Sequence, residues 1–308
     1  MRWSRRRRII EDLLKWLFDR EAFGRPSEPA ELAGHFGWSS ARAQREIQQL
    51  RELGHVEPKS LRLTPEGRAL GERIARTHRL VETYLAQETD LDPREWHRRA
   101  HAAEHKLTLE EADALAQSLG EPVYDPHGDP IPTAEALGVE LPKCKSLLDC
   151  PAGWVGRIAH IEDEPETLFR ALAGKGLAPD MQFRVTRAAP DRIEIESEGR
   201  RIELSREEAG QIGVRELGPH EVYDPTIRRL SDLPLGAKAR VVGLSPRVRG
   251  VARDRLLQLG FVRNSLVEVE LENPSGDPVA YRVRGALIAL RRSQAADILV
   301  RRVAEGSS

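Results

Sequence analysis

The N-terminal part of the chain has the hydrophobic periodicity of short amphipathic helices. Apolar residues at positions 9, 10, 13, 14, 17 and 18 predict a helix over 9–18 with one buried face. A second, short helix is expected over 31–35 with Ser27 as its N-cap, and a third helix begins near Ser39 or Ser40. A short helix, a tight turn and another helix form the geometry of a helix-turn-helix motif.

The segment after the third helix completes a winged helix-turn-helix. Residues 55–58 and 61–64 read as two short β segments, and Thr64 can cap a long helix that starts at Pro65. Side chains that suit base edges and phosphates are expected to point outward on the third helix and the wing: Arg42, Gln44, Arg45, Gln49, Lys59 and Arg62. We therefore expect residues 1–66 to bind double-stranded DNA, with a helical protein-interaction surface as the alternative.

Beyond residue 140 the pattern changes to short strands, and the same pattern occurs twice. Asp149-Cys-Pro-Ala-Gly153 matches Asp232-Leu-Pro-Leu-Gly236, and the strands that follow in each copy alternate apolar and polar residues. Such alternation is expected of a small β-barrel. The sequence thus predicts an α+β protein that closes with two copies of one β domain, at 145–217 and 228–303.

Composition and charge limit the class of protein. A chain of 308 residues with 40% hydrophobic residues can form two or three packed domains, and it has no apolar run long enough to span a bilayer. We therefore expect a cytoplasmic protein without membrane insertion. Residues 1–79 carry 17 Lys and Arg against 11 Asp and Glu, whereas residues 80–308 carry 31 against 38. This asymmetry places a polyanion-binding surface in the first part of the chain.

The middle of the chain, residues 67–140, contains a predicted helix with ligand-type side chains on one face. His97, His101, Glu104 and His105 fall within a sector roughly 100° wide on an α-helix. His78 and Glu82 form a second same-face pair on the preceding helix. A solvated polar surface is the alternative, and it would be preferred for any single His. Four such side chains together favour a metal-binding face, with two metal positions between two packed helices. Helices inserted behind a DNA-binding head also commonly dimerise, and a two-fold operator needs a dimer.

Several motifs together resemble the diphtheria-toxin-repressor family of metal-dependent transcriptional regulators. They are the winged helix, His78-x-x-x-Glu82, His97-x-x-x-His101-x-x-Glu104-His105, and above all Asp125-Pro-His-Gly-Asp-Pro-Ile-Pro132. The terminal repeats resemble the SH3-like domain that ends many members of the family, which is also the fold of a small protein of bacterial ferrous iron uptake systems. Family members usually have one such domain, so the second copy is a departure.

The resemblance implies two metal sites. The primary regulatory site would consist of Asp12, His101, Glu104 and His105. The ancillary site would consist of His78, Glu82 and His97 with His160 and Asp163 from the first SH3-like domain, although Glu162 or Glu164 could replace one of these two. The DNA contacts would lie near Ser39, Arg42 and Arg45.

The residue at position 101 bears on the choice of metal. Iron-responsive members of the resembled family usually have Cys there and manganese-responsive members Glu, whereas this chain has His101. Two imidazoles and two carboxylates suit Fe(II), Co(II) or Zn(II) at least as well as Mn(II). The uptake-like domain favours Fe(II).

The resulting hypothesis is a metal-activated repressor. Metal binding would tie the first helix, through Asp12, to the helix that carries His101, Glu104 and His105, and would thereby fix the two heads of a homodimer on a palindromic operator. A second hypothesis is an adaptor whose SH3-like domains dock on a ferrous-iron transporter. A metalloenzyme is disfavoured, because Arg98 stands where zinc hydrolases need a Glu directly after the first His. We therefore expect no enzyme activity.

Overall fold

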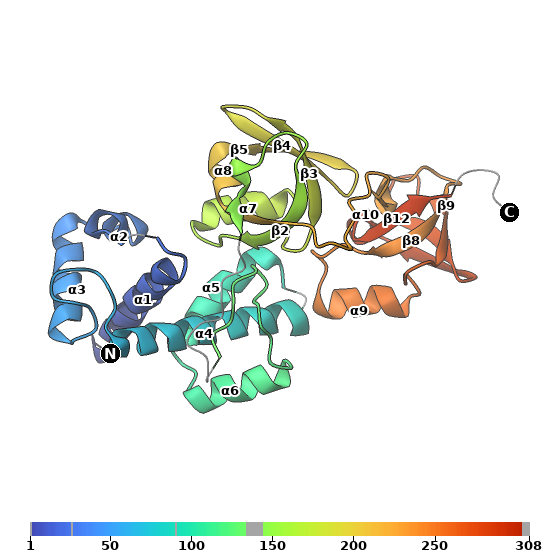
Figure 1. Ribbon diagram of the computed structural model, residues 1–308. Helices are drawn as coiled ribbons and strands as arrows, with labels where there is room; N and C mark the ends of the chain where they lie inside the picture. Colours follow the sequence, from blue (N-terminus) through green and yellow to red (C-terminus); the bar gives the residue numbers. More distant parts are fainter. Residues whose placement is uncertain (1, 26, 90, 134–143, 304–308) are drawn as a thin grey trace. The chain divides into compact units, whose positions relative to one another are not determined.

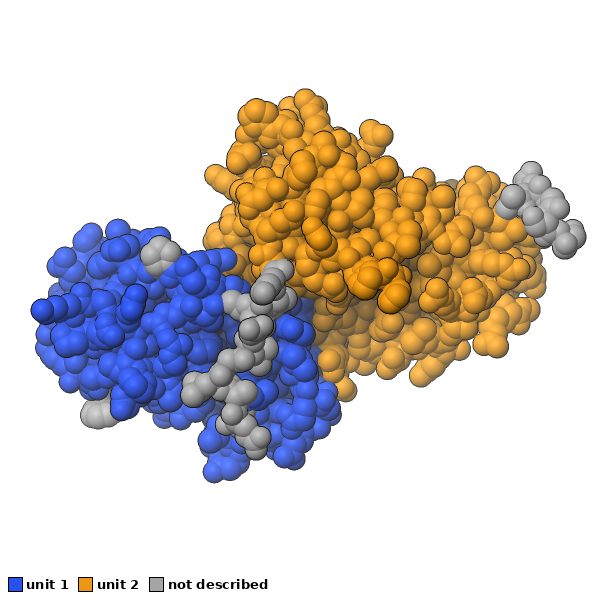
Figure 2. Space-filling view, viewed as in Figure 1, with its two compact units in different colours: residues 1–85, 95–141 blue, residues 86–94, 142–308 orange. Residues whose placement is uncertain are grey.

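The computed structural model describes residues 2–25, 27–89, 91–133 and 144–303 (Figure 1). The chain divides into two compact units, shown in two colours in Figure 2. Unit 1 consists of Met1–Leu85 and Glu95–Leu141, and unit 2 consists of Ala86–Arg94 and Pro142–Ser308. Residues 134–140, the end of the predicted helical domain, lie outside the described residues.

Unit 1 is helical. The helices of this part of the chain are α1 (Arg2–Ala22), α2 (Pro29–His35), α3 (Ser40–Glu52), α4 (Pro65–Glu88), α5 (Pro93–Glu104) and α6 (Leu109–Ser118). The first three form the head. Its core contains Leu13, Leu14 and Leu17 of α1 packed with Ile47 and Leu50 of α3. The apolar periodicity of the sequence therefore placed the buried face of α1 correctly, although the helix extends beyond both ends of the predicted segment.

Local capping explains where these helices begin. The Ser39 hydroxyl accepts a hydrogen bond from the backbone N–H of Arg42 at 3.3 Å, and Thr64 accepts one from Gly67 at 3.1 Å. The prediction of Ser27 as the cap of α2 is wrong. Glu28 takes that position, and its backbone N–H donates to the Glu31 carboxylate at 3.2 Å. A Glu three residues after the cap can reach back in this way, and the motif places the cap one residue past Ser27.

The wing is shorter than the two β segments that the sequence predicted. A single antiparallel bridge joins Val56 to Leu63, flanked by a hydrogen bond from the Glu57 N–H to the Arg62 carbonyl at 2.9 Å. Pro58 follows immediately and has no N–H to donate, so the pairing cannot extend through the turn as a regular ladder.

A glycine lets α1 lie close to α4. A Cβ added at Gly71 of α4 would lie 2.5 Å from the carbonyl oxygen of Leu14 and 3.0 Å from the Cβ of Phe18. Any larger residue would therefore push the two helices apart. This close packing determines where the polar residues on the neighbouring turns of α1 lie, which matters for the site described below.

Unit 2 contains two antiparallel sheets of the same topology, which confirms the predicted repeat. The first sheet has the order β1-β6-β2-β3-β4-β5 and the second, read in the same direction, β7-β12-β8-β9-β10-β11. The elements of the first copy are β1 (Lys145–Ser146), η1 (Leu147–Asp149), β2 (Val155–Ile161), α7 (Glu166–Gly174), β3 (Gln182–Ala188), β4 (Arg192–Ser197), β5 (Arg200–Ser205), α8 (Arg206–Gly210) and β6 (Ile212–Glu216). Those of the second copy are β7 (Arg228–Arg229), η2 (Leu230–Asp232), β8 (Lys238–Leu244), α9 (Gly250–Gln258), β9 (Leu266–Glu272), β10 (Val279–Val283), β11 (Ala286–Leu290), α10 (Arg292–Ala295) and β12 (Ile298–Arg302).

The two copies match in detail as well as in topology. Each has its own apolar core, one around Phe183 and the other around Phe261. The glycine of each matched motif, Gly153 and Gly236, has a positive φ of 87° or 78° and donates its N–H to the equivalent strand of its own sheet. The α+β class is therefore confirmed: a helical part precedes two small SH3-like domains. Among the described residues, none of the helices is long and apolar enough to cross a membrane.

Candidate metal centre

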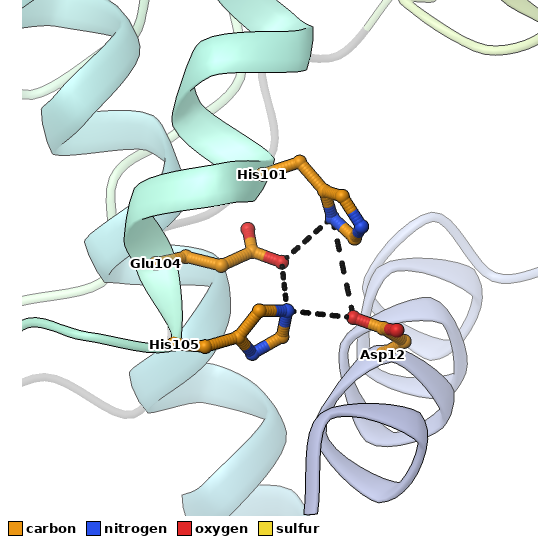
Figure 3. A group of neighbouring side chains, drawn as sticks. All are labelled: Asp12, His101, Glu104 and His105. Atoms are coloured by element: carbon orange, nitrogen blue, oxygen red, sulfur yellow. Dashed lines mark ion pairs between the residues drawn. The ribbon is translucent and has the colours of Figure 1, made fainter. Parts of the chain in front are cut away.

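Helices α1 and α5 bring together four of the predicted ligands (Figure 3). Asp12 projects from α1, His101 and Glu104 lie in the last turn of α5, and His105 follows that turn directly. One ligand atom of each residue lies within 4.8 Å of those of the other three. We call these four residues the primary cluster.

The distances inside the primary cluster are short. His105 Nε2 lies 3.0 Å from Asp12 Oδ1 and 3.4 Å from Glu104 Oε1. His101 Nδ1 lies 2.9 Å from Glu104 Oε1 and 4.0 Å from Asp12 Oδ1. The side chains of Glu104 and His105 are buried, whereas the His101 side chain is half exposed to solvent. The cluster therefore lies at the edge of unit 1, where an ion can enter.

Two atoms of the primary cluster are buried without a hydrogen-bond partner in the described part of the chain. They are Asp12 Oδ1 and His105 Nε2, the same pair that lies 3.0 Å apart. Leaving such groups unsatisfied normally costs about 1–3 kcal/mol each. A divalent cation would satisfy both, and the set of two imidazoles and two carboxylates is one that first-row transition metals bind. The residues therefore fit the metal that the sequence predicted.

Glu11, which no sequence motif marked, contacts the other ring nitrogen of His105. Its Oε2 lies 2.8 Å from His105 Nδ1, and both side chains are buried. Burial opposes a charge on His105, but the neighbouring carboxylates of Asp12 and Glu11 raise its pKa to about 9. A carboxylate on the far nitrogen of a ligand His is a common way to orient the ring toward a metal. The sequence signal for Glu11 was weak, because an acidic residue on a helix is usually solvated.

A second cluster of ligand-type side chains lies on α4 and α5 within unit 1. His78 Nε2 lies 3.0 Å from Glu82 Oε1 and 3.2 Å from His97 Nδ1. His97 Nδ1 is in turn 3.4 Å from Glu82 Oε1. We call His78, Glu82 and His97 the ancillary cluster. The structure thus brings together the three helical residues that the resemblance assigned to the ancillary site.

His160 and Asp163, the other two predicted ancillary ligands, belong to unit 2. His160 is buried near the end of β2, where its Nε2 lies 3.2 Å from Glu162 Oε1. Asp163 is partly buried two residues beyond that strand. Their role as metal ligands stays a prediction.

The turn-rich motif at residues 125–132 packs beside the ancillary cluster. Asp125 Oδ1 accepts hydrogen bonds from the backbone N–H groups of His127 and Asp129, each at 2.8 Å. Arg79 of α4 donates to the carbonyl of Pro130 at 2.7 Å. This folding buries His127 with its Nε2 3.5 Å from Glu82 Oε1. The sequence motif alone did not reveal that His127 is a neighbour of the site.

The predicted DNA contacts lie on α3 and the wing of the head. Gln44, Arg45, Lys59 and Arg62 are exposed. Ser39 is exposed as well, but its hydroxyl caps α3. Arg42 is partly buried, and its guanidinium lies over the Trp38 ring at 4.2 Å from the ring centre, which holds it at the start of the helix.

Comparison with known proteins agrees with this architecture. Residues 64–133 match the family model of the iron-dependent repressor metal-binding and dimerisation domain, and residues 145–216 and 228–302 each match the FeoA domain. The diphtheria toxin repressor of Corynebacterium efficiens is 31% identical over 133 residues, which are 42% of this chain and 58% of that protein. A probable metal transport system membrane protein of Chlamydia trachomatis is 43% identical over 70 residues, 23% of this chain and 16% of that protein. The chain thus spans 58% or less of the length of these two curated relatives.

A solved structure is similar to about two thirds of this chain. A manganese-dependent transcriptional repressor in complex with manganese superimposes with a TM-score of 0.61 and 29% identity, covering 68% of this chain and all of that one. The fold and the clusters define a winged-helix protein with a helical metal-binding domain. The chain belongs to the diphtheria-toxin-repressor family of metal-dependent regulators, and it carries two FeoA domains.

Proposed function

We propose that this protein is a metal-dependent transcriptional repressor that controls genes of iron or manganese homeostasis. It acts as a homodimer that binds a palindromic operator when a divalent metal occupies the primary cluster. The observation that carries the proposal is the buried pair Asp12 Oδ1 and His105 Nε2, 3.0 Å apart and without hydrogen bonds at the junction of α1 and α5.

The position of Asp12 explains how the cluster acts on the head. Asp12 is followed by Leu13 and Leu14, which lie in the core of the head, and so its helix cannot move without the DNA-binding part. When bound, a divalent cation supplies the positive charge that lets Asp12 and Glu104 share one site. Asp12 then holds the head against α5, and the two heads of a dimer keep a fixed spacing for successive major grooves.

The head supplies the DNA-binding surface in this proposal. Exposed Gln44 and Arg45 on α3 read base edges, while Lys59 and Arg62 on the wing contact phosphates. Arg42 and Ser39 position the start of α3 on the DNA backbone. Dimerisation through the helical part presents two such heads to the two halves of the operator.

Fe(II) is the favoured metal, with Mn(II), Co(II) and Zn(II) as alternatives. His101 replaces a thiolate or a third carboxylate in the primary cluster, and a mixed nitrogen and oxygen site favours the later first-row metals. The two FeoA domains also favour iron as the activating metal. The adaptor hypothesis, in which these domains dock on a ferrous-iron transporter, is less well supported because the repressor relatives match the helical part that carries both clusters.

The test is fluorescence anisotropy of the full chain with duplex DNA from its own promoter region under anaerobic conditions. The protein is titrated with chelator present and then with Fe(II), Mn(II) or Zn(II) added in turn. The proposal predicts binding that appears only with metal and is tightest with the physiological one. Equal binding in chelator would refute metal activation.

A further inference from the structure

A lysine occupies the space between the two clusters. Lys15 lies on α1, and its Nζ is 3.1 Å from Glu104 Oε2, 3.4 Å from Glu104 Oε1 and 3.3 Å from His78 Nδ1. Only 12% of the Lys15 side chain is exposed. A positive charge is therefore fixed between the primary and ancillary clusters, in contact with one residue of each.

Glu104 and His78 each direct one ligand atom into their own cluster and the other toward the space that Lys15 occupies. Glu104 directs Oε1 to His101 and His105 in the primary cluster, whereas its Oε2 contacts His78 Nδ1. His78 uses its other nitrogen, Nε2, for Glu82 and His97. Glu104 Oε2 and His78 Nδ1 are thus ligand atoms of two different clusters that are in direct contact.

A carboxylate between two groups of ligands is the arrangement by which proteins bridge two metal ions about 3.5–4 Å apart. Here the Lys15 ammonium lies beside this carboxylate and donates a hydrogen bond to Glu104 Oε2. A lysine carries three donors and no acceptor, so it satisfies the Glu104 oxygens but cannot bind a metal beside them.

We propose that Lys15 takes the place of a divalent cation between Glu104 and His78, so that the two clusters bind metal as separate sites and not as a bridged pair. Its charge also weakens metal binding at the primary cluster, because it repels the ion and engages a carboxylate that the ion needs. Lys15 therefore sets both the number of ions bound and the concentration at which the protein responds. The inference rests on the proposed function only in requiring that these clusters bind metal.

The test is the number and affinity of Mn(II) ions bound by the full chain, measured by equilibrium dialysis with electron paramagnetic resonance of the free ion. Lys15→Glu replaces the ammonium with a carboxylate, and it should bind one more Mn(II) per chain than the wild type. Lys15→Met removes the charge without adding a ligand, and it should bind the same number with about ten-fold or greater gain in affinity. Lys106→Met, at an exposed lysine next to His105, is the matched control and should change neither quantity.

The outcomes separate this inference from the proposed function. An unchanged Mn(II) number in folded Lys15→Glu, with unchanged affinity in Lys15→Met, overturns the role of Lys15 and leaves the metal site standing. If Lys15→Glu does not fold, unchanged affinity in Lys15→Met is sufficient to overturn it. A wild type that binds no ion while Lys15→Glu binds one supports the role of Lys15 and refutes metal activation. No binding by either protein overturns both.

Discussion

Glu11 gives the sharpest prediction about the primary cluster, because its side chain forms an ion pair with His105 and with no other residue of that cluster. Its Oε2 accepts a hydrogen bond from the His105 Nδ1–H over 2.8 Å, which leaves Nε2 directed at Asp12 and Glu104. Burial raises the pKa of Glu11, but hydrogen bonds from His105 and Arg7 outweigh it and hold the pKa below its usual value. Glu11 therefore stays ionised while it orients the imidazole.

The expected magnitude follows from that single contact. Removing the outer hydrogen-bond partner of a ligand His typically costs about 10–100-fold in metal affinity, or about 1.4–2.7 kcal/mol. Glu11→Gln keeps a carbonyl oxygen that can accept from Nδ1 but loses the charge, so we expect a loss of about ten-fold. Glu11→Ala loses both and should reach about a hundred-fold. Arg7 and Arg73, which also form ion pairs with Glu11, have side chains that are 64% and 38% exposed, so the loss of these ion pairs should matter little.

The assay is Mn(II) titration calorimetry on the full chain at one fixed pH, with circular dichroism melting of the metal-free protein as the folding control. Glu110→Gln, on the exposed first turn of α6, is the matched substitution and should bind as the wild type does. Wild-type affinity in both Glu11 variants, with unchanged melting, would refute the idea that Glu11 orients His105.

Three further predictions concern the switch and the DNA-binding surface. Asp12→Ala should abolish metal-dependent operator binding without unfolding the chain, and a full metal response in anisotropy would rule out Asp12 as the link between α1 and α5. Arg45→Ala should weaken operator binding by about 1–3 kcal/mol if Arg45 reads a base, whereas unchanged affinity would move the readout elsewhere on α3. Metal at a hundred times its dissociation constant should stabilise the wild type by about 2.7 kcal/mol, seen as a shift of the urea midpoint. Asp12→Ala should lack most of this shift, and an equal shift in both proteins would place the stabilising ion outside the primary cluster.

The helical part shows which features of a fold can be predicted from local sequence. Thr64 was predicted correctly as a cap, and the start of α3 was predicted near Ser39, because a hydroxyl three residues before a free backbone N–H is a local signal. Ser27 failed because Glu28 and Glu31 supply a competing local motif one residue later. The repeat of unit 2 was also predictable, since the matched motifs fold into sheets of the same strand order.

The candidate site was predictable only in part. Helical spacing places His97, His101 and Glu104 on one face of α5, but no periodicity brings Asp12 of α1 to that face, and the family resemblance was needed for it. Glu11 and Lys15 were missed for a physical reason. Charged residues on a helix are normally solvated, and their burial here results from the packing of α1 on other helices, which the local sequence does not reveal.

The most direct test of metal activation is reciprocal linkage between metal and DNA. Metal affinity of the full chain is measured by equilibrium dialysis alone and again with saturating operator duplex, and the DNA affinity is measured with and without metal. If the primary cluster controls the head, DNA must tighten metal binding by the same factor as metal tightens DNA binding, within the range of about 5–150-fold that is typical of such coupling. Equal metal affinity with and without the operator would contradict the account, because it would show that the metal site and the DNA-binding surface are not coupled.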